Sequence, residues 1–341
     1  MKIRVLTFSS AINYGALLQT YALSKVLQKE GHVVELYRSS LFKSFIEEWM
    51  RIHSYARFVR DFQQKYLPPF IPLTAKPEAD CYIVGSDQVW NPFFLSFCGH
   101  LFFFDFLPDT CKRIAYAASF GEDAWEFPDI SRHAIANLLN KFSHISLREK
   151  SSVSRFEKEF GIRAQFVLDP TLVWIDYSEL TGPIVRQNTL ISFKFNQSGD
   201  YYGCLQKISK ELDLNLIRLD SRYFKFKGKE YINRYCSVSR WVKEIAESEF
   251  VVTDSFHGMV FAILYKRPFI ALPSSPSKNG RMLSLLDFLG LSERYYNSCQ
   301  EILMNKKWKM KIDYDSVENK LDELRKISLT FLKEALVDPQ N

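Results

Sequence analysis

The chain has 341 residues, 47% of them hydrophobic and 25% charged, and 45 Lys and Arg against 39 Asp and Glu give a formal charge of +6. This mixture, free of low-complexity tracts, excludes disordered, collagen-like and coiled-coil proteins. The excess charge is too small and too dispersed for a nucleic-acid-binding surface, but it suits small anionic substrates or an anionic membrane surface. At about 100 to 200 residues per domain, the length predicts two domains with a cleft between them.

Cysteine spacing and the N-terminal residues bear on the compartment. The six cysteines are Cys81, Cys98, Cys111, Cys204, Cys236 and Cys299. They show no C-x-x-C spacing in a chain too long for a disulfide scaffold, so we expect reduced thiols. The apolar stretch at 5–8 is too short for a signal peptide, and no apolar run approaches the ~18 residues of a membrane span. We therefore expect a cytoplasmic protein.

Residues 1–168 alternate between apolar strands and amphipathic helices. A strand at 3–8, a helix from about 15 to 30 and a strand at 33–37 predict an opening βαβ unit of a parallel sheet. Gly31 ends that helix, whose N-terminus points at the loop 9–15. The other predicted elements of this half are a helix at 42–66 and strands at 81–84, 114–118 and 145–147.

A second α/β series begins after Asp169-Pro170, which breaks the pattern. Its predicted strands are 189–195, 214–219, 250–253 and 269–272, and an amphipathic helix is expected at 315–336. We predict domains at 1–168 and 169–312, with 313–341 crossing back to the first. YIVGSDQVWNP and FVVTDSFHGMVF, one in each half, both run from an apolar strand into an acid and a serine, as two similar α/β halves would.

Several common motifs are absent. No G-x-G pair occurs, which argues against the dinucleotide fingerprint and the Walker loop, and neither H-E-x-x-H nor G-x-S-x-G is present. A D-x-D at 313–315 has the spacing that sugar transferases use for a metal-nucleotide complex. Asp315 followed by Glu318 also fits the capped start of the last helix, and we favour that interpretation. We expect no metal site.

Three loops follow predicted strands, where open α/β sheets bind ligands. The first, with Ser9, Ser10, Asn13, Tyr14 and Gly15, leads into a helix whose free N–H groups form an anion site. A plain helix cap would need only one of these polar groups.

The second loop, at 85–92, holds Asp87, Gln88, Trp90 and Asn91. Its hydrogen-bonding groups beside an aromatic ring suit a sugar, but an Asx turn followed by a structural Trp explains them equally well.

The third loop, at 253–258, contains Asp254, Ser255 and His257 at a strand-to-helix turn. A phosphate bound at the helix start would favour protonated imidazole, which makes His257 a candidate general acid, although a lone histidine is more often structural. Arg148 and Arg281 each stand at a helix start, and converging guanidinium groups clamp carboxylate or phosphate. Surface ion pairing is the alternative for each arginine.

Six motifs follow one another in the order of a known family. They are NYGALLQ at 13–19, GSDQVWN at 85–91, YAASFG at 116–121, LREKSS at 147–152, VLDPTLVW at 167–174 and TDSFHGMVFAILYKRPFI at 253–270. Over about residues 10–291 the chain resembles the polysaccharide pyruvyl transferase family. The resemblance implies an α/β fold of two Rossmann-like domains with a central cleft, similar to the GT-B glycosyltransferases. It also implies transfer of pyruvate from phosphoenolpyruvate to a sugar as a cyclic ketal.

The resemblance places the family's functional histidine at His257 and its donor-holding arginine at Arg148. Many members carry an arginine two residues before the histidine, where this chain has Ser255. Either Lys266, Arg267 or Arg281 compensates for the missing guanidinium, or this branch of the family uses another donor or acceptor.

The expected site thus has three parts. The catalytic residues are His257, Asp254 and Asp87. The donor-binding residues are Arg148, Arg281, Ser255, Asn13 and Gly15. The acceptor-binding residues are Tyr14, Gln88, Trp90 and Asn91. Phosphoenolpyruvate is the expected co-substrate, with no bound cofactor.

Two other functions compete with pyruvyl transfer: a nucleotide-sugar glycosyltransferase on the same scaffold, and a catalytically silent glycan-binding protein. The expected acceptor is a sugar of a surface or capsular polysaccharide, or its lipid-linked precursor. The aromatic and basic segment 49–66 suits docking to the inner membrane face, or equally plain domain packing.

Overall fold

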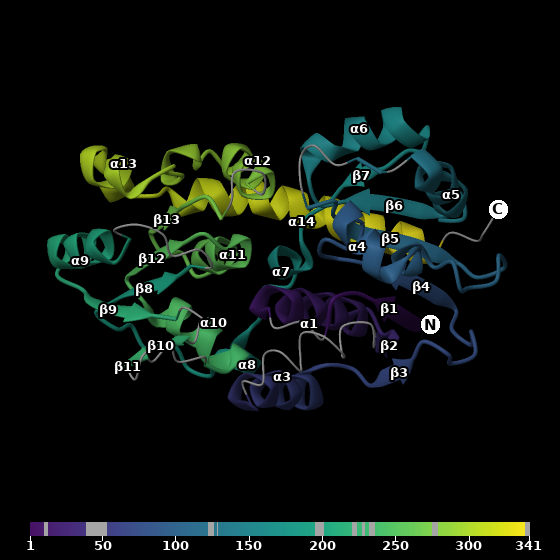
Figure 1. The fold of residues 1–341 in the computed structure, drawn as a ribbon, viewed down its shortest axis with the longest axis horizontal. Helices are drawn as coiled ribbons and strands as arrows, with labels where there is room; N and C mark the ends of the chain where they lie inside the picture. Colours follow the sequence, from purple (N-terminus) through teal and green to yellow (C-terminus); the bar gives the residue numbers. More distant parts are fainter. Residues whose placement is uncertain are drawn as a thin grey trace. The chain divides into compact units, whose positions relative to one another are not determined.

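The chain folds around two parallel β-sheets, each in one of two compact units (Figure 1). The first unit comprises residues 1–52, 63–174 and 321–341, and the second residues 53–62 and 175–320. The computed structural model describes residues 1–9, 13–38, 53–121, 126–127, 129–194, 201–219, 224–226, 229–231, 236–274 and 279–337. The predicted α/β class is confirmed.

The sheet of the first unit has the strand order β3-β2-β1-β4-β5-β6-β7, and every neighbouring pair is parallel. Its strands are β1 (Lys2–Leu6), β2 (Val33–Arg38), β3 (Phe70–Pro72), β4 (Cys81–Val84), β5 (Arg113–Ala118), β6 (His144–Leu147) and β7 (Gln165–Phe166). Every residue of β4 and β5 is buried, as expected for central parallel strands covered on both faces. The predicted strands form this centre, whereas the two short edge strands had no pattern long enough to predict them.

Helices connect these strands, and the first of them is α1 (Tyr14–Lys29), directly after β1. The others are α4 (Pro92–Cys98), α5 (Asp129–Leu139), α6 (Lys150–Phe160) and α7 (Pro170–Val173), with the 3-10 turn η2 (Leu101–Phe103). Helix α3 (His53–Tyr66) contains residues of both units. It corresponds to the end of the helix predicted at 42–66, of which residues 42–52 lie outside the described part.

The last helix, α14, runs from Tyr314 to Val337. Asp313, not Asp315 as predicted, caps it: its Oδ1 accepts a hydrogen bond from the backbone N–H of Ser316 at 3.1 Å. Residues from Leu321 onward belong to the first unit, where Ser328 Oγ accepts from the backbone N–H of Leu168 at 2.9 Å. Helix α14 is the yellow helix in Figure 1.

The second unit is built on a parallel sheet of order β13-β12-β8-β9. Its strands are β8 (Thr189–Phe193), β9 (Asn215–Arg218), β12 (Phe250–Thr253) and β13 (Phe269–Ala271), and a separate antiparallel pair is formed by β10 (Phe224–Phe226) and β11 (Lys229–Tyr231). Its helices are α8 (Ser178–Thr181), α9 (Tyr201–Leu212), α10 (Val238–Glu247), α11 (Phe256–Leu264), α12 (Gly280–Leu289) and α13 (Cys299–Met304), with 3-10 turns η3 (Ser292–Arg294) and η4 (Lys306–Lys309). Leu190, Val252, Ile270 and Trp308 lie in its core.

The segment 169–174, which the sequence assigned to the second domain, lies in the first unit. Asp169 accepts a hydrogen bond from Arg148 after β6, and Arg325 of α14 donates to the carbonyl of Leu172 at 2.8 Å. These two bonds tie the segment to the first sheet and to the last helix.

None of the helices described is both long and apolar enough to cross a membrane.

Candidate functional site

The predicted site residues fall into two groups, one in each unit, and both lie where parallel strands end. We call Asp87, Arg148, Glu149 and Asp169, in the first unit, the acidic cluster. We call Lys194, Asp254, His257 and Arg281, in the second unit, the basic cluster.

The loop after β4 brings Asp87 to the sheet edge by an unusual backbone path. Gly85 has φ +108°, and a Cβ there would lie 2.2 Å from the carbonyl oxygen of Tyr116 on β5, so only glycine fits. Asp87 itself adopts φ 73°, a left-handed conformation that Asp tolerates better than most residues. The Asp87 carboxylate accepts a hydrogen bond from the backbone N–H of Gln88 at 2.9 Å.

Arg148 follows β6 and forms the centre of the acidic cluster. Its Nη1 donates to Asp169 Oδ2 at 2.6 Å, its Nη2 lies 3.4 Å from Asp87 Oδ1 and its Nε 3.6 Å from Glu149 Oε1. The Arg148 side chain is 2% exposed. Burial alone would lower the pKa of Arg148, but the carboxylates of Asp169, Asp87 and Glu149 outweigh it and raise that pKa. The guanidinium therefore stays charged.

The carboxylates of the cluster are also held by hydroxyl and backbone donors. Asp169 accepts from the Thr171 hydroxyl at 2.6 Å and from its backbone N–H at 3.0 Å, and Glu149 accepts from the Ser119 hydroxyl at 2.6 Å. Among the printed contacts of this cluster, one guanidinium faces three carboxylates, so carboxylates outnumber cations there. The closest contact of Arg148 is thus with Asp169 at 2.6 Å, and Asp87 lies farther away at 3.4 Å.

The loop residues after Asp87 differ sharply in exposure. Asn91 caps α4 by accepting from the backbone N–H of Phe93 at 2.9 Å, and its Nδ2 donates to Gln88 Oε1 at 3.0 Å. Trp90 was predicted to stack on a sugar, but it is only 1% exposed. Phe103 and Phe156 stack on it at 5.5 and 6.0 Å between ring centroids. The structure corrects that prediction, because the indole lies in the core.

The start of α1 is occupied by helix capping and packing. Asn13 Oδ1 accepts from the backbone N–H of Gly15 at 2.9 Å, as the capped-helix interpretation requires. Tyr14 is 3% exposed, and the acceptor contact expected for it stays a prediction. Ser10 lies outside the described residues.

In the second unit, the predicted residues lie at the turn from strand β12 to the start of helix α11. Ser255 caps this helix, because its hydroxyl accepts from the backbone N–H of Gly258 at 3.2 Å. The Thr253 hydroxyl donates to the carbonyl of Phe193 on β8 at 2.7 Å. A Cβ on Gly258 would lie 2.5 Å from the Thr253 hydroxyl, so glycine allows the helix to start close to the strand.

His257 and Arg281 share one aromatic neighbour. The His257 ring meets the Phe256 ring edge-on at 5.2 Å, and the Arg281 guanidinium lies over the same Phe256 ring at 5.7 Å. His257 is 6% exposed. The structure therefore places Arg281 over the ring next to His257, although the two residues are 24 positions apart in the sequence.

Lys194 is a member of the basic cluster that the sequence reasoning missed. It directly follows β8, and its Nζ lies 3.9 Å from Asp254 Oδ2. The Asp254 side chain is fully buried, at 0% exposure, and faces Lys194. The role of catalytic base stays a prediction. A lysine ending an apolar strand was visible at 194, but nothing in the sequence showed which strand lies beside β8.

A family comparison settles the relationship to known proteins. The model of the polysaccharide pyruvyl transferase family matches residues 13–276. The chain belongs to this family. Polysaccharide pyruvyl transferases are transferases, and the match contains the acidic cluster and, of the basic cluster, all members except Arg281. No curated protein sequence matches the chain.

Solved structures share the fold at low sequence identity. The UDP co-structure of MnaA from S. aureus has a TM-score of 0.56 at 12% identity, with 100% of this chain and 99% of that chain covered. UDP-GlcNAc 2-epimerase from Neisseria meningitidis, bound to UDP-GlcNAc, has 0.54 at 11%, covering 98% and 100%. Spinosyn rhamnosyltransferase SpnG has 0.50 at 10%, covering 98% and 99%. These likenesses show a GT-B-like α/β fold of two Rossmann-like domains.

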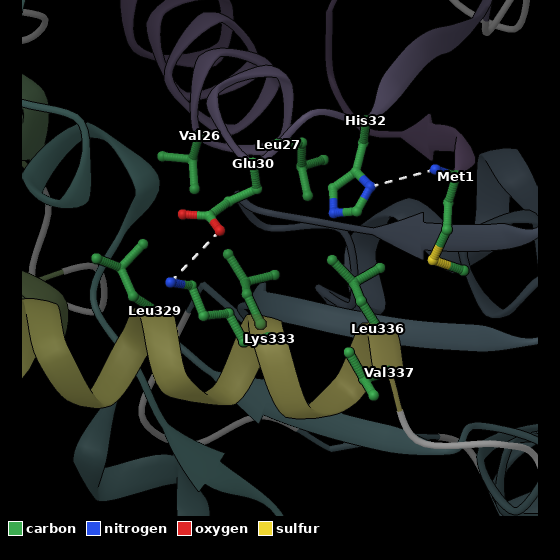
Figure 2. A pocket seen from close by; sticks show the side chains of 10 residues that line it. Met1, Val26, Leu27, Glu30, His32, Leu329, Lys333, Leu336 and Val337 are labelled. Atoms are coloured by element: carbon green, nitrogen blue, oxygen red, sulfur yellow. Dashed lines mark hydrogen bonds and ion pairs between the residues drawn. The ribbon is translucent and has the colours of Figure 1, made fainter.

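The first unit contains a cavity of about 320 Å³ (Figure 2). No residue of the acidic cluster or the basic cluster lines it. Apolar side chains of α1 and α14 line it, together with Lys333 and Glu30, which form an ion pair at 3.4 Å. Within the described ranges, no three His, Cys, Asp or Glu side chains are arranged to hold a metal ion.

Proposed function

We propose that this polysaccharide pyruvyl transferase moves pyruvate from phosphoenolpyruvate to two hydroxyls of a saccharide, forming a cyclic ketal. The observation that carries the proposal is the pairing of a buried histidine, His257, with a guanidinium, Arg281, on one aromatic ring in a chain of this family. An imidazole is suited to proton transfer near neutral pH, and a guanidinium binds carboxylate or phosphate.

The reaction we propose proceeds in two stages. A proton added to the terminal methylene of phosphoenolpyruvate makes the methyl group and leaves an oxocarbenium-like carbon, to which the first sugar hydroxyl adds. The carbon–oxygen bond to phosphate then breaks, and the second hydroxyl closes the ketal. Of the two hydroxyl protons, one balances the proton taken up by the methyl group and the other leaves with inorganic phosphate.

We assign His257 to the proton delivered to the methylene, and Arg281 to the donor's negative charge. Phosphate departure shifts charge that a fixed cation stabilises. Ser255 and the start of α11 are assigned to the same donor, and Asn13 and Gly15 remain predicted donor contacts.

We assign Asp87 as the base for a sugar hydroxyl, with Gln88 and Asn91 as hydrogen-bonding partners of the acceptor. Asp87 is the most exposed carboxylate of the acidic cluster, at 10% for its side chain against 4% and 0% for Glu149 and Asp169. Arg148 then serves as the residue that positions Asp87, in place of the donor-binding role that the resemblance implied.

The acceptor we propose is a sugar of a surface or capsular polysaccharide, or its lipid-linked precursor, modified in the cytoplasm at the inner membrane face. A net positive charge of 6 suits approach to such an anionic surface.

Donor identity is tested by thermal unfolding with phosphoenolpyruvate, inorganic phosphate, UDP-GlcNAc and GDP-mannose in parallel. A ligand at 100 times its dissociation constant stabilises the folded state by about 2.7 kcal/mol. We expect stabilisation by phosphoenolpyruvate beyond that by phosphate. Product formation is then followed as phosphate release and as the mass gain of a pyruvate ketal across an acceptor panel. Stabilisation by a nucleotide sugar alone would contradict the proposal in favour of glycosyl transfer.

His257→Gln provides the matched variant, because it keeps a polar side chain but cannot deliver the proton. We expect phosphoenolpyruvate binding within a few-fold of wild type and a loss of turnover of about 10²- to 10⁴-fold, the usual contribution of general acid catalysis. Unchanged turnover would remove His257 from the reaction.

A further inference from the structure

The ends of β8 and β12 place a lysine beside a buried acid. These strands are parallel neighbours, and Phe193 is paired with Thr253 in their register. The first residue after β8 is Lys194 and the first after β12 is Asp254, and their charged atoms lie 3.9 Å apart. Carboxyl ends of adjacent parallel strands are where α/β sheets bind their ligands.

Lys194 is held from a second side by an aromatic ring. Its Nζ lies 5.0 Å from the centre of the Tyr201 ring at the start of α9. The Tyr201 hydroxyl is in turn hydrogen-bonded to the Ser192 hydroxyl of β8 at 2.8 Å. The ammonium is thus oriented by a carboxylate and by a ring that is itself fixed to the strand, so little side-chain freedom is left to lose when a ligand binds.

Exposure shows which member of the pair faces outward. The Asp254 side chain is 0% exposed and the Lys194 side chain 10%. Asp254 is therefore shielded from a ligand, and Lys194 is the group of the pair that reaches the surface. Arg281, over the Phe256 ring, is the other cation that we include in the basic cluster.

We propose that Lys194 binds an anionic group of the donor, and that Asp254 is the residue that positions it. The identity of the donor as phosphoenolpyruvate rests on the proposed function, whereas the assignment of the anion to Lys194 rests on this geometry. Phosphoenolpyruvate carries two anionic groups, a carboxylate and a phosphate, so one cation at Arg281 leaves the second group to be matched.

The test is isothermal titration of phosphoenolpyruvate, inorganic phosphate and UDP-GlcNAc into wild type, Lys194→Met, Lys194→Arg and Lys210→Met. Lys210 is an exposed lysine on α9 in the same unit, so its loss controls for net charge. We expect Lys194→Met to weaken phosphoenolpyruvate binding about 10- to 100-fold, the range for a lost hydrogen bond to a charged group. Lys194→Arg keeps the charge and should restore most of the affinity, and Lys210→Met should leave it unchanged.

A second readout separates ligand binding from a structural role. Binding through the ammonium weakens as salt screens it, so Lys194→Met should lose part of the ionic-strength dependence of the dissociation constant. A fold defect would instead lower the melting temperature without changing that dependence.

A double variant guards against loss of the fold. Lys194→Met alone leaves the buried Asp254 carboxylate without this cation, whereas Lys194→Met with Asp254→Asn removes both charges and keeps the net charge of the chain. We expect the double variant to melt near wild type and to bind phosphoenolpyruvate as weakly as Lys194→Met.

The outcomes distinguish the two proposals. If wild type binds phosphoenolpyruvate and neither the single nor the double variant weakens it, the role of Lys194 is overturned and the proposed function stands. If wild type binds only UDP-GlcNAc and Lys194→Met weakens that binding, the role of Lys194 is supported and phosphoenolpyruvate is overturned as donor. If wild type binds none of the three, both are overturned.

Discussion

The loops after β4 and β12 share a local sequence pattern, but their aspartates have neighbours of opposite charge. Each loop follows a buried parallel strand at the interior of its sheet. A serine and an aspartate stand within three residues of the end of that strand. Asp87 faces Arg148 together with two further carboxylates. Asp254 instead faces Lys194, in a unit where Arg281 adds a second cation. The neighbouring strand ends, more than the loops themselves, decide what each aspartate does.

From this difference in surrounding charge we infer a different task for each cluster. A carboxylate-rich cluster repels anions and suits a base acting on a neutral hydroxyl, and the proposed role of Asp87 follows from that. A cation-rich cluster suits a donor with two negative groups. The predictions below test this contrast from the largest expected effect to the smallest.

Removing the cation from the acidic cluster should have the largest effect on stability. Arg148→Ala leaves three buried carboxylates without their shared guanidinium, and breaking such a buried pair costs about 3–5 kcal/mol of unfolding free energy. Arg186→Ala is the control, because Arg186 pairs with Glu249 on the surface, at 43% and 39% exposure, where the median contribution is about 0–1 kcal/mol. Urea unfolding of both variants measures the difference. Equal small losses would show that Arg148 does not hold the cluster together.

Changing the charge of Asp87 should affect turnover more than donor binding. We expect Asp87→Asn to lower turnover about 100-fold or more, because the amide cannot accept the hydroxyl proton. Phosphoenolpyruvate affinity should remain within a few-fold, since this aspartate belongs to the other unit's cluster. Phosphate release with a working acceptor, together with titration of the donor, separates the two effects. A loss confined to donor affinity would reverse the division of tasks.

Trp90 tests whether the first-unit loop uses its aromatic residue for packing or for sugar binding. Trp90→Phe keeps a ring between Phe103 and Phe156 but loses the hydrogen bond from the indole to the carbonyl of Phe102, which spans 3.0 Å. We expect a loss of about 1–3 kcal/mol in stability from the unpaired buried carbonyl and smaller ring, and an unchanged acceptor KM. An increase in acceptor KM at unchanged stability would restore the sugar-stacking interpretation.

A glycine comparison should give the smallest effect. Gly121 has φ +81°, and a Cβ there would lie 2.3 Å from Gln88 Oε1 and 2.5 Å from Asn91 Nδ2. Gly161 has φ +66° with nothing within 4 Å of a Cβ. Both Ala variants carry a positive-φ cost of about 1–2 kcal/mol, and we expect Gly121→Ala to lose additional stability because it also separates the Gln88–Asn91 pair. Equal melting temperatures would mean that this pair contributes little.

Much of the fold could be predicted because central strands such as β4 and β12 are apolar runs that the structure buries completely. Strands β4 and β12 begin and end where the sequence predicted. The sequence predicted Asp315 as the cap of α14, whereas Asp313 caps it in the structure. Both aspartates precede the helical pattern by a plausible spacing, and only the backbone path distinguishes them. The edge strands β3 and β7 were not predicted, because strands of three and two residues are too short to show a periodicity.

For the candidate site, the sequence identified the loops but misjudged some of their side chains. Trp90 and Tyr14 have the residue types of a sugar-binding surface, yet their apolar area is larger than their polar area, and the core covers it. His257 and Arg281 were recognised individually, but their common neighbour Phe256 was not.

The sequence by itself determined the α/β alternation, the family and the positions where strands end, because these depend on local apolar runs and on motifs read in order. Only the tertiary structure decided which cation meets which acid: Arg148 lies 61 positions from Asp87, and Lys194 60 positions from Asp254. Such pairs form when strands distant in the chain become neighbours in a sheet. That choice depends on the packing of the whole sheet, and no local pattern carries it.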